Sequence, residues 1–414
     1  MSKRSPARPA MQDVRAAGLC QETVDDFAAH LRSQGFAVST SRQYAAIVQR
    51  YRAWLHHPRK KEMRVGEESA DAFVHKCQST RRLRHVHHHR ASLKRLLRML
   101  RDRGELAAPP APPPTVIDMA IQEFSTHLRE TCGLAQSTMR HHLQYVRCFL
   151  QHQYGNGPLQ LHRLCRSDLV AFVASGAQRW TPACVPGIAS SLRRYCRYLQ
   201  LHGICGPQLA AAVPTTPRWK LATLPRTMTE QQLQTFLSSF DRKTAMGRRN
   251  YAIGLLLATL GLRASDIAAL RLDDLNWRES SIRIAIPKSR RVKAFPLPHR
   301  VGQAIVDYLR HGRPATSVRQ IFVRHVAPKD TPLTTAAVRG TAIAAYRRCG
   351  FDPQWKGVHI LRHTVATHLH QRGGSLKEVA DLLGHRSIES SAVYAKVNLP
   401  ELAAVALPWP EVTA

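Results

Sequence analysis

A stretch of sequence near the N-terminus recurs about ninety-eight residues further along the chain, and this repeat restricts the possible folds of the first half more than any other feature. The apolar residues of both copies follow the spacing of amphipathic helices. Helices of similar composition can match by chance, but the offset stays nearly constant over four pairs of segments. We therefore predict two copies of one small all-α unit. The matching pairs are Phe27–Arg32 with Phe124–Arg129, Ser39–Arg42 with Ser137–Arg140, Asp71–Val74 with Leu169–Val173, and Ala91–Leu96 with Ser190–Tyr195.

Two proline-rich segments mark boundaries between domains. Residues 109–114 contain five prolines and no glycine, so we expect a stiff spacer of polyproline type. A second proline-rich break spans residues 207–226. The predicted organisation is a flexible basic N-terminus (1–19), a helical domain (20–108), a linker (109–114), a second helical domain (115–206), a second linker (207–226) and a final domain with a C-terminal tail (227–414).

The final domain begins with signals for an apolar helix and a turn. Thr229 opens a capping-like start, and the apolar run from Asn250 to Leu260 predicts a core helix. Gly261 ends this helix, so that Arg263 lies in a turn before a further helix over 265–270. An arginine in such a turn commonly binds carbonyl oxygens, and it can also bind a phosphate.

A β-hairpin is predicted next. Apolar residues alternate with a period of two over 281–286 and 292–295, and a turn separates the two runs. Lys288 lies at this turn. Lys293, in the second strand, is a competing candidate for any role that requires a lysine here.

Residues 359–394 combine helix-boundary signals with reactive side chains. A helix with an apolar stripe at Leu361, Val365 and Leu369 is predicted to end at Gly373-Gly374. A second helix begins at a capping box formed by Ser375 and Glu378 and stops at Gly384, and a last short helix is expected over 387–397.

Four side chains of this segment could act together on a phosphodiester. His359 and Arg362 share a face at the start of a helix, where unpaired N–H groups and the positive end of the dipole favour an anion. His385 follows the end of the second helix, and Tyr394 lies nine residues later. Taken singly, such residues are mostly capping or packing residues. Their combination favours phosphodiester chemistry.

These ordered motifs resemble the tyrosine recombinases, also called the phage integrase family, which include the Xer-type enzymes. The resemblance covers residues 226–400 and implies a mainly α protein. Two small all-α DNA-binding domains, the second a SAM-like core-binding domain, would precede a mixed α+β catalytic domain with a small antiparallel β-sheet. The motifs are His359-Ile360-Leu361-Arg362-His363, Leu383-Gly384-His385, Tyr394, Thr259–Asp266 and Ile286–Pro298. The family's catalytic positions correspond to Arg263, Lys288, His359, Arg362, His385 and Tyr394.

The resemblance also implies a role for each of these residues. The two arginines and His385 would hold the non-bridging phosphate oxygens and stabilise the charge that grows in the transition state. Tyr394 would attack the phosphorus, with His359 as the candidate base, and Lys288 would protonate the departing 5′ oxygen. His363 would have a supporting role. The 3′-phosphotyrosyl link stores the bond energy, so that neither ATP nor a metal is required.

The same resemblance indicates the biological reaction and leaves alternatives open. It favours integration, excision or resolution of a mobile element, and the segments Ala395–Val397 and Leu407–Pro410 resemble integrases that occur as adjacent trios in bacterial mobile elements. The alternatives are a catalytically silent accessory DNA-binding homologue, a telomere resolvase and a topoisomerase. Two features depart from the family pattern, namely Asp266 where many relatives have glutamate and the additional N-terminal helical unit.

Two histidine patterns could instead indicate a metal site. His359 and His363 have a zinc-ligand spacing, but Arg362 lies between them and no glutamate follows His359. The histidine-rich run over 81–90 has arginines at both ends and lacks a cysteine or carboxylate, which favours a DNA-facing surface. We therefore predict no metal and no other cofactor.

The charge of the chain indicates its partner. Sixty-one Lys and Arg against 28 Asp and Glu give a formal charge of +33, which indicates a polyanion such as double-stranded DNA. No apolar run is long enough for a membrane span, and the basic N-terminus lacks an apolar signal core. Nine cysteines without a C-x-x-C pair fit buried free thiols. We expect a bacterial, cytoplasmic protein associated with the nucleoid.

The family resemblance further implies assembly on DNA. A homo-oligomer, in the form of a tetrameric synapse, is expected, with related recombinases as further partners. The amphipathic tail over 398–410 would dock on a neighbouring protomer, or would pack on its own domain.

Overall fold

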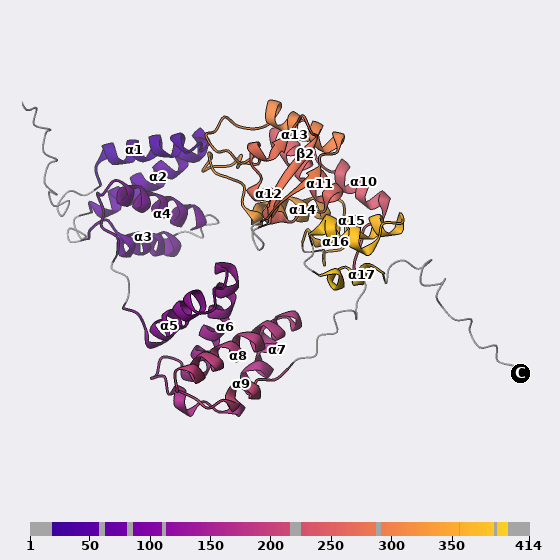
Figure 1. Ribbon diagram of the computed structural model, residues 1–414. Coiled ribbons are helices and arrows are strands. Elements are labelled where there is room, and N and C mark those ends of the chain that lie inside the picture. Colours follow the sequence, from indigo (N-terminus) through magenta and orange to yellow (C-terminus); the bar gives the residue numbers. More distant parts are fainter. Residues whose placement is uncertain are drawn as a thin grey trace, which may run out of the picture. The chain divides into compact units, whose positions relative to one another are not determined.

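The chain is mainly helical and includes a small antiparallel β-sheet, as the sequence predicts (Figure 1). The computed structural model describes residues 19–57, 63–80, 86–109, 113–215, 225–286, 291–355, 357–384 and 387–395. The chain divides into two compact units: residues 109–222 form one, and residues 1–108 and 223–414 form the other.

The first bundle packs four amphipathic helices on one core. Phe27, Leu31 and Leu96 have no exposed surface and form its centre. Leu19, which was assigned to the flexible N-terminus, is also buried in this core. The helices are α1 (Gln21–Ser33), α2 (Val38–Leu55), α3 (Glu67–Thr80) and α4 (Val86–Asp102).

The second bundle has its own core, centred on Phe124 and Leu128. Thr115 and Asp118 form a capping box at its first helix. The structure differs from the predicted linker over 207–226, because a short helix forms there and buries Leu209 in this core. The elements are α5 (Val116–Glu130), α6 (Gln136–Tyr154), η2 (Leu161–Arg163), α7 (Arg166–Arg179), η3 (Pro182–Cys184), α8 (Val185–Leu201) and α9 (Gln208–Ala212).

The main helices of the two bundles correspond in order and spacing. Helix α5 begins 95 residues after α1, and α6, α7 and α8 begin 98, 99 and 99 residues after α2, α3 and α4. Equivalent side chains are buried in both bundles, since Phe27 matches Phe124 and Leu31 matches Leu128, all without exposed surface. The shared helix order and shared core positions agree with a repeated all-α unit.

The region after residue 225 contains the remaining helices around a core in which the apolar helix α11 is buried along most of its length. Helix α11 begins five residues before the predicted helix, because Thr244 caps it. The predicted helix over 387–397 is instead two short elements in its described part. The elements are α10 (Glu230–Ser238), α11 (Ala245–Leu260), α12 (Ala264–Ala269), η4 (Leu272–Asp274), α13 (His299–His311), α14 (Thr335–Arg348), α15 (His359–Gln371), α16 (Leu376–Leu383), η5 (Ile388–Ser390) and α17 (Ala392–Ala395).

The sheet has three strands in the order β1-β2-β3, all antiparallel. Strands β2 (Ser281–Ile286) and β3 (Arg291–Pro296) form the predicted hairpin, with Ile282 opposite Phe295. Strand β1 (Leu275–Asn276) was not predicted, because two residues are too short to show a period.

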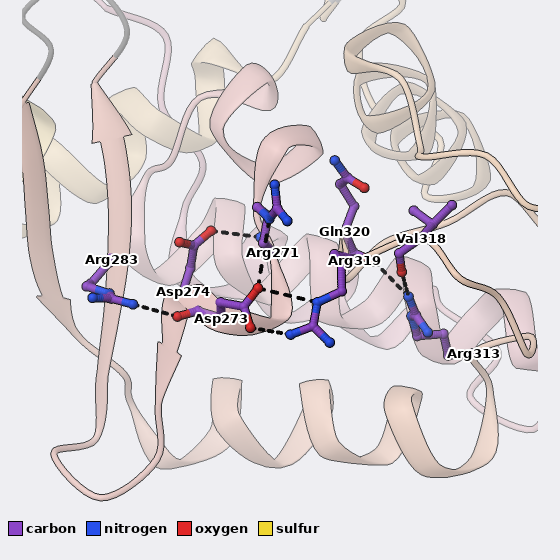
Figure 2. Close-up of polar contacts among 8 residues, drawn as sticks. All are labelled: Arg271, Asp273, Asp274, Arg283, Arg313, Val318, Arg319 and Gln320. Atoms are coloured by element: carbon purple, nitrogen blue, oxygen red, sulfur yellow. Dashed lines mark hydrogen bonds and ion pairs between the residues drawn. The ribbon is translucent and has the colours of Figure 1, made fainter.

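A network of arginines fastens η4 to the segment that follows α13 (Figure 2). Asp273 forms an ion pair with Arg319, and the carbonyl oxygen of Asp273 accepts a hydrogen bond from Arg283 at 2.7 Å. The guanidinium of Arg319 holds the pKa of the Asp273 carboxyl below its usual value. Arg313 donates hydrogen bonds to the carbonyl oxygens of Val318, Gln320 and Ile321. Backbone hydrogen bonds join the same regions, from the N–H of Leu272 to the carbonyl oxygen of Arg319 at 3.0 Å and from the N–H of Ile321 to that of Leu270 at 2.9 Å, so side chains and backbone hold the segment together.

Three further findings concern the cysteines, membrane-spanning helices and metal sites. All nine cysteines are free thiols, but they are not all buried as expected: only Cys196 is fully buried, and Cys20 and Cys165 are exposed. No helix in the described ranges is long and apolar enough to cross a membrane. Among the residues that the structure describes, no three His, Cys, Asp or Glu side chains are grouped so that they could hold a metal ion.

Candidate active site

Helix ends from distant parts of the chain meet around Arg263 and Arg362. Arg263 is the residue before α12, and Arg362 lies in the first turn of α15. Gly261 ends α11 in the left-handed conformation, with a φ of +59°. A Cβ atom on Gly261 would lie 3.2 Å from a methyl group of Leu383, so glycine also allows the end of α16 to come close.

The guanidinium of Arg362 binds these helix ends together. Arg362 is only 8% exposed, and its Nη1 donates a hydrogen bond of 2.7 Å to the carbonyl oxygen of Gly261. Its Nη2 donates to the carbonyl oxygen of Leu383. Burial, together with the positive charge of Arg263, lowers the pKa of Arg362 to about 10. The side chain is therefore still a cation at neutral pH, and a guanidinium has five N–H donors, so donors remain for a phosphate.

Arg263 acts on the same site through its charge. Its guanidinium lowers the pKa of Arg362 and that of His359, so the three groups lie within electrostatic range of one another. The carboxylate of Asp266 accepts a hydrogen bond from the backbone N–H of Arg263 at 3.3 Å and favours the charged form of Arg362. Asp266, although shorter than glutamate, thus stabilises the start of α12 and partly compensates the two cations.

His359 begins α15 and retains contact with solvent. Partial burial beneath neighbouring side chains lowers its pKa, and the positive charges of Arg362, Arg339 and Arg263 lower it further. His359 is therefore neutral at pH 7. It lies beside the arginines, where a phosphate would be bound.

Tyr394 is a residue of α17, and its phenol is hydrogen-bonded to the side chain of His363 on α15. The Nδ1 atom of His363 lies 2.9 Å from the phenol oxygen, and the ring centroids are 5.7 Å apart. Burial raises the pKa of Tyr394, and the positive charge of Arg362 opposes this increase. Burial also lowers the pKa of His363, with contributions from His359 and Arg362. Both side chains are therefore uncharged at pH 7.

The phenol ring is packed in a small apolar cluster between α15, α16 and α17. Tyr394 is 2% exposed, and Ala366, Val379 and Leu383 surround it. A phosphate can reach the phenol oxygen only if part of this cover moves.

Four of the six predicted site residues are described, and the structure brings them into one region: Arg263, His359, Arg362 and Tyr394. Lys288 and His385 lie outside the described residues. The competing Lys293 donates a hydrogen bond to the carbonyl oxygen of Asp381, and its ammonium group lies 5.3 Å from the centroid of the Phe295 ring. The amine of Lys293 is therefore already bound to α16.

Two parts of this arrangement were not foreseen from the sequence. His363 was expected only to support the site, yet it contacts the phenol directly. Its position one helical turn after His359 was the available signal. The apolar stripe of α15 was predicted at Leu361, Val365 and Leu369, and Arg362 was expected only to share a face with His359. The structure instead buries Arg362 and leaves Val365 and Leu369 half-buried, since α11 and α16 also pack on α15.

The chain is similar in sequence to integrases and recombinases. Residues 226–400 match the model of the phage integrase family. The chain is 35% identical over 322 residues to a putative integrase/recombinase, y4rA, of Sinorhizobium fredii, which covers 77% of this chain and 78% of the relative. It is 27% identical to the tyrosine recombinase XerD of Listeria monocytogenes, over 67% of this chain and 94% of the relative.

A solved structure shares the fold at low sequence identity. A lambda integrase tetramer bound to a Holliday junction matches with a TM-score of 0.53 and 15% identity, covering 76% of this chain and 87% of that chain.

Proposed function

This chain belongs to the tyrosine recombinases of the phage integrase family, and from that premise we propose that it cuts and rejoins DNA through a 3′-phosphotyrosyl intermediate on Tyr394. The single observation that carries this proposal is the meeting of Arg263, Arg362 and Tyr394 in one site, although they come from distant parts of the sequence. Two guanidiniums and a phenol are the groups that an attack on a phosphodiester requires.

In this reaction the arginines bind the non-bridging oxygens of one phosphate and stabilise the charge that develops on them. Tyr394 attacks the phosphorus, and the 5′ oxygen departs. His359 and His385 donate further hydrogen bonds or accept protons, and Lys288 protonates the leaving oxygen. Because burial favours the neutral phenol, a nearby base has to remove its proton during the attack.

The partner is double-stranded DNA, and the two helical bundles bind it together with the catalytic domain over 227–414. A formal charge of +33 supports this assignment, since neutralised phosphates release counterions. The lambda integrase match, a tetramer on a Holliday junction, supports a four-protomer synapse. The sequence resemblance to mobile-element integrases supports a role in integrating, excising or resolving such an element.

The proposal is tested by trapping the covalent intermediate. The full chain is incubated with a library of DNA fragments that carry single-strand nicks, so that cleavage beside a nick releases a short strand and the adduct cannot be resealed. After denaturation, protein-linked DNA is isolated and sequenced. We expect adducts at one recurring sequence, with Tyr394 as the linked residue in a tryptic digest.

Tyr394→Phe is the matched control, because it removes a single oxygen atom. We expect it to bind the recovered site as tightly as the unaltered chain and to form no adduct. If the unaltered chain binds fragments of the library but forms no adduct with any of them, the chain is a catalytically silent accessory homologue and the proposal is wrong.

A further inference from the structure

Among the described residues, the side chain that hydrogen-bonds the phenol of Tyr394 is His363. The distance from Nδ1 to the phenol oxygen is 2.9 Å. His359, the base expected from the sequence, lies one turn earlier on α15, with its ring centroid 6.5 Å from that of His363. His359 faces the positive charges of Arg263, Arg339 and Arg362. The two histidines therefore face different parts of the site, His359 the phosphate-binding arginines and His363 the nucleophile.

We propose that His363 is the base that accepts the phenolic proton of Tyr394 during strand cleavage and that it also orients the phenol. This inference rests on the proposed function. It gives His359 a different task, as a hydrogen-bond donor to the bound phosphate. Arg362 and His363 are consecutive residues of one helix, so the group that binds the phosphate and the group that binds the nucleophile are fixed relative to each other.

The electrostatic surroundings keep His363 ready to accept a proton. Burial and the charges of His359 and Arg362 lower its pKa, so the ring is neutral at pH 7. The titratable and charged groups that act on it are His359 and Arg362 of α15 and Tyr394 of α17. Within the described residues, α11 and α16 also pack on α15 but contribute no further charge to this shift. A neutral ring with a proton on Nε2 leaves Nδ1 free to accept the phenolic O–H.

The proton moves during bond formation and not before it. At rest the phenol holds its proton far more strongly than an imidazolium would, because burial raises the pKa of Tyr394 and lowers that of His363. As the phenol oxygen bonds to phosphorus, it becomes acidic, and its proton passes to Nδ1 of His363. The bond from phosphorus to the 5′ oxygen breaks, the electron pair stays on that oxygen, and Lys288 or water supplies its proton. In religation His363 returns the proton to the phenol.

The test compares variants of the full chain on the DNA site recovered by the trapping experiment. His363→Asn places an amide atom near the position of Nδ1, so it can still hold the phenol but cannot accept a proton at neutral pH. His363→Ala removes both functions. His368→Asn is the control, because His368 lies on the same helix but faces Glu230, with 3.9 Å between Nδ1 and the carboxylate. The rate of adduct formation is measured from pH 5 to 9, and DNA affinity and thermal unfolding are measured in parallel.

We expect His363→Asn to slow adduct formation by about 10²- to 10⁴-fold at pH 7, with unchanged DNA affinity and unfolding temperature. The rate for the unaltered chain should fall on the acidic side, as His363 becomes protonated. In His363→Asn the level rate above this fall should disappear, and the rate should rise continuously up to pH 9 because only the phenolate then reacts. Free imidazole should restore part of the rate of His363→Ala, and His368→Asn should react normally.

Two results would overturn the inference. One is a His363→Asn rate within about threefold of the unaltered rate. The other is loss of the level region in His359→Asn while His363→Asn retains it. In either case, adducts that still depend on Tyr394 would leave the proposed function intact. Adducts formed by Tyr394→Phe would refute the proposed function itself.

Discussion

The guanidinium of Arg362 and the carbonyl oxygen of Gly261 are joined by a hydrogen bond of 2.7 Å, although the two residues are 101 positions apart in the chain. The same guanidinium also binds the carbonyl oxygen of Leu383. One buried side chain thus fixes the helix end that precedes Arg263 and the helix end that precedes His385. Arg362 therefore stabilises the folded site in addition to its proposed contact with a phosphate.

Arg362→Lys should impair stability as well as cleavage. A lysine keeps the positive charge, but its single ammonium group cannot replace a planar guanidinium that reaches two carbonyl oxygens. At least one carbonyl oxygen would stay buried without a donor, which costs about 1–3 kcal/mol. We expect the free energy of unfolding, measured with urea, to fall by that amount. Unchanged stability together with lost cleavage would show that Arg362 serves the phosphate alone.

The sequence predicted the elements around this site better than it predicted their contacts. Gly261, Gly384 and the capping box of Ser375 with Glu378 mark helix ends locally, and the structure places those ends where expected. The contact of His363 with Tyr394 depends on how α17 packs against α15, and no local pattern encodes that packing. The burial of Arg362 has the same cause, because α11 and α16 cover a residue that its own helix pattern leaves exposed.

Arg313→Ala should destabilise the protein more than Arg319→Ala. Arg313 is partly buried and donates to three backbone carbonyl oxygens, whereas Arg319 binds the carboxylate of Asp273 and both members of that pair are more than half exposed. Water can replace the second interaction but not the first. We expect Arg313→Ala to lower the free energy of unfolding by about 2 kcal/mol in urea denaturation. The effect of Arg319→Ala should be much smaller and should diminish in high salt. Equal losses would contradict this assignment.

Gly247→Ala and Gly340→Ala should change stability in opposite directions. Both glycines lie within helices, but a Cβ atom at Gly247 would come within 1.7 Å of the carbonyl oxygen of Asp241, while one at Gly340 would meet nothing within 4 Å. The first substitution forces the backbone apart, at a cost of about 1–3 kcal/mol. The second restricts the unfolded chain and should stabilise the protein by about 0.5–1 kcal/mol. Thermal unfolding of the two variants distinguishes these outcomes, and a shift of the same sign in both would refute the steric argument.

The catalytic domain should lose stability in acid partly because of His325. Burial, with the positive charges of Arg249 and Lys329, lowers the pKa of His325 to about 4. Below its ordinary pKa of about 6.5 the unfolded chain binds a proton that the folded chain does not, so stability falls as the pH decreases from about 6.5 to 4. His325→Gln keeps a nitrogen near the Tyr308 hydroxyl, which lies 3.2 Å from the histidine, and cannot titrate. The difference between the two curves of Tm against pH should grow over this interval by several °C. Parallel curves would show that His325 does not contribute.

The two lysines of the hairpin should respond differently to the leaving group. A proton donor is needed when the departing atom is oxygen, but a thiolate leaves without one. We expect Lys288→Ala to slow cleavage of ordinary DNA by about 10²- to 10⁴-fold and to recover on a substrate with sulfur in place of the 5′ bridging oxygen. Lys293 is bound to the carbonyl oxygen of Asp381, so Lys293→Ala should have a smaller effect that is equal on both substrates. The measurement is the initial rate of adduct formation on the paired substrates. Recovery of Lys293→Ala alone would transfer the acid role to Lys293, because selective rescue by sulfur identifies the group that protonates the leaving oxygen.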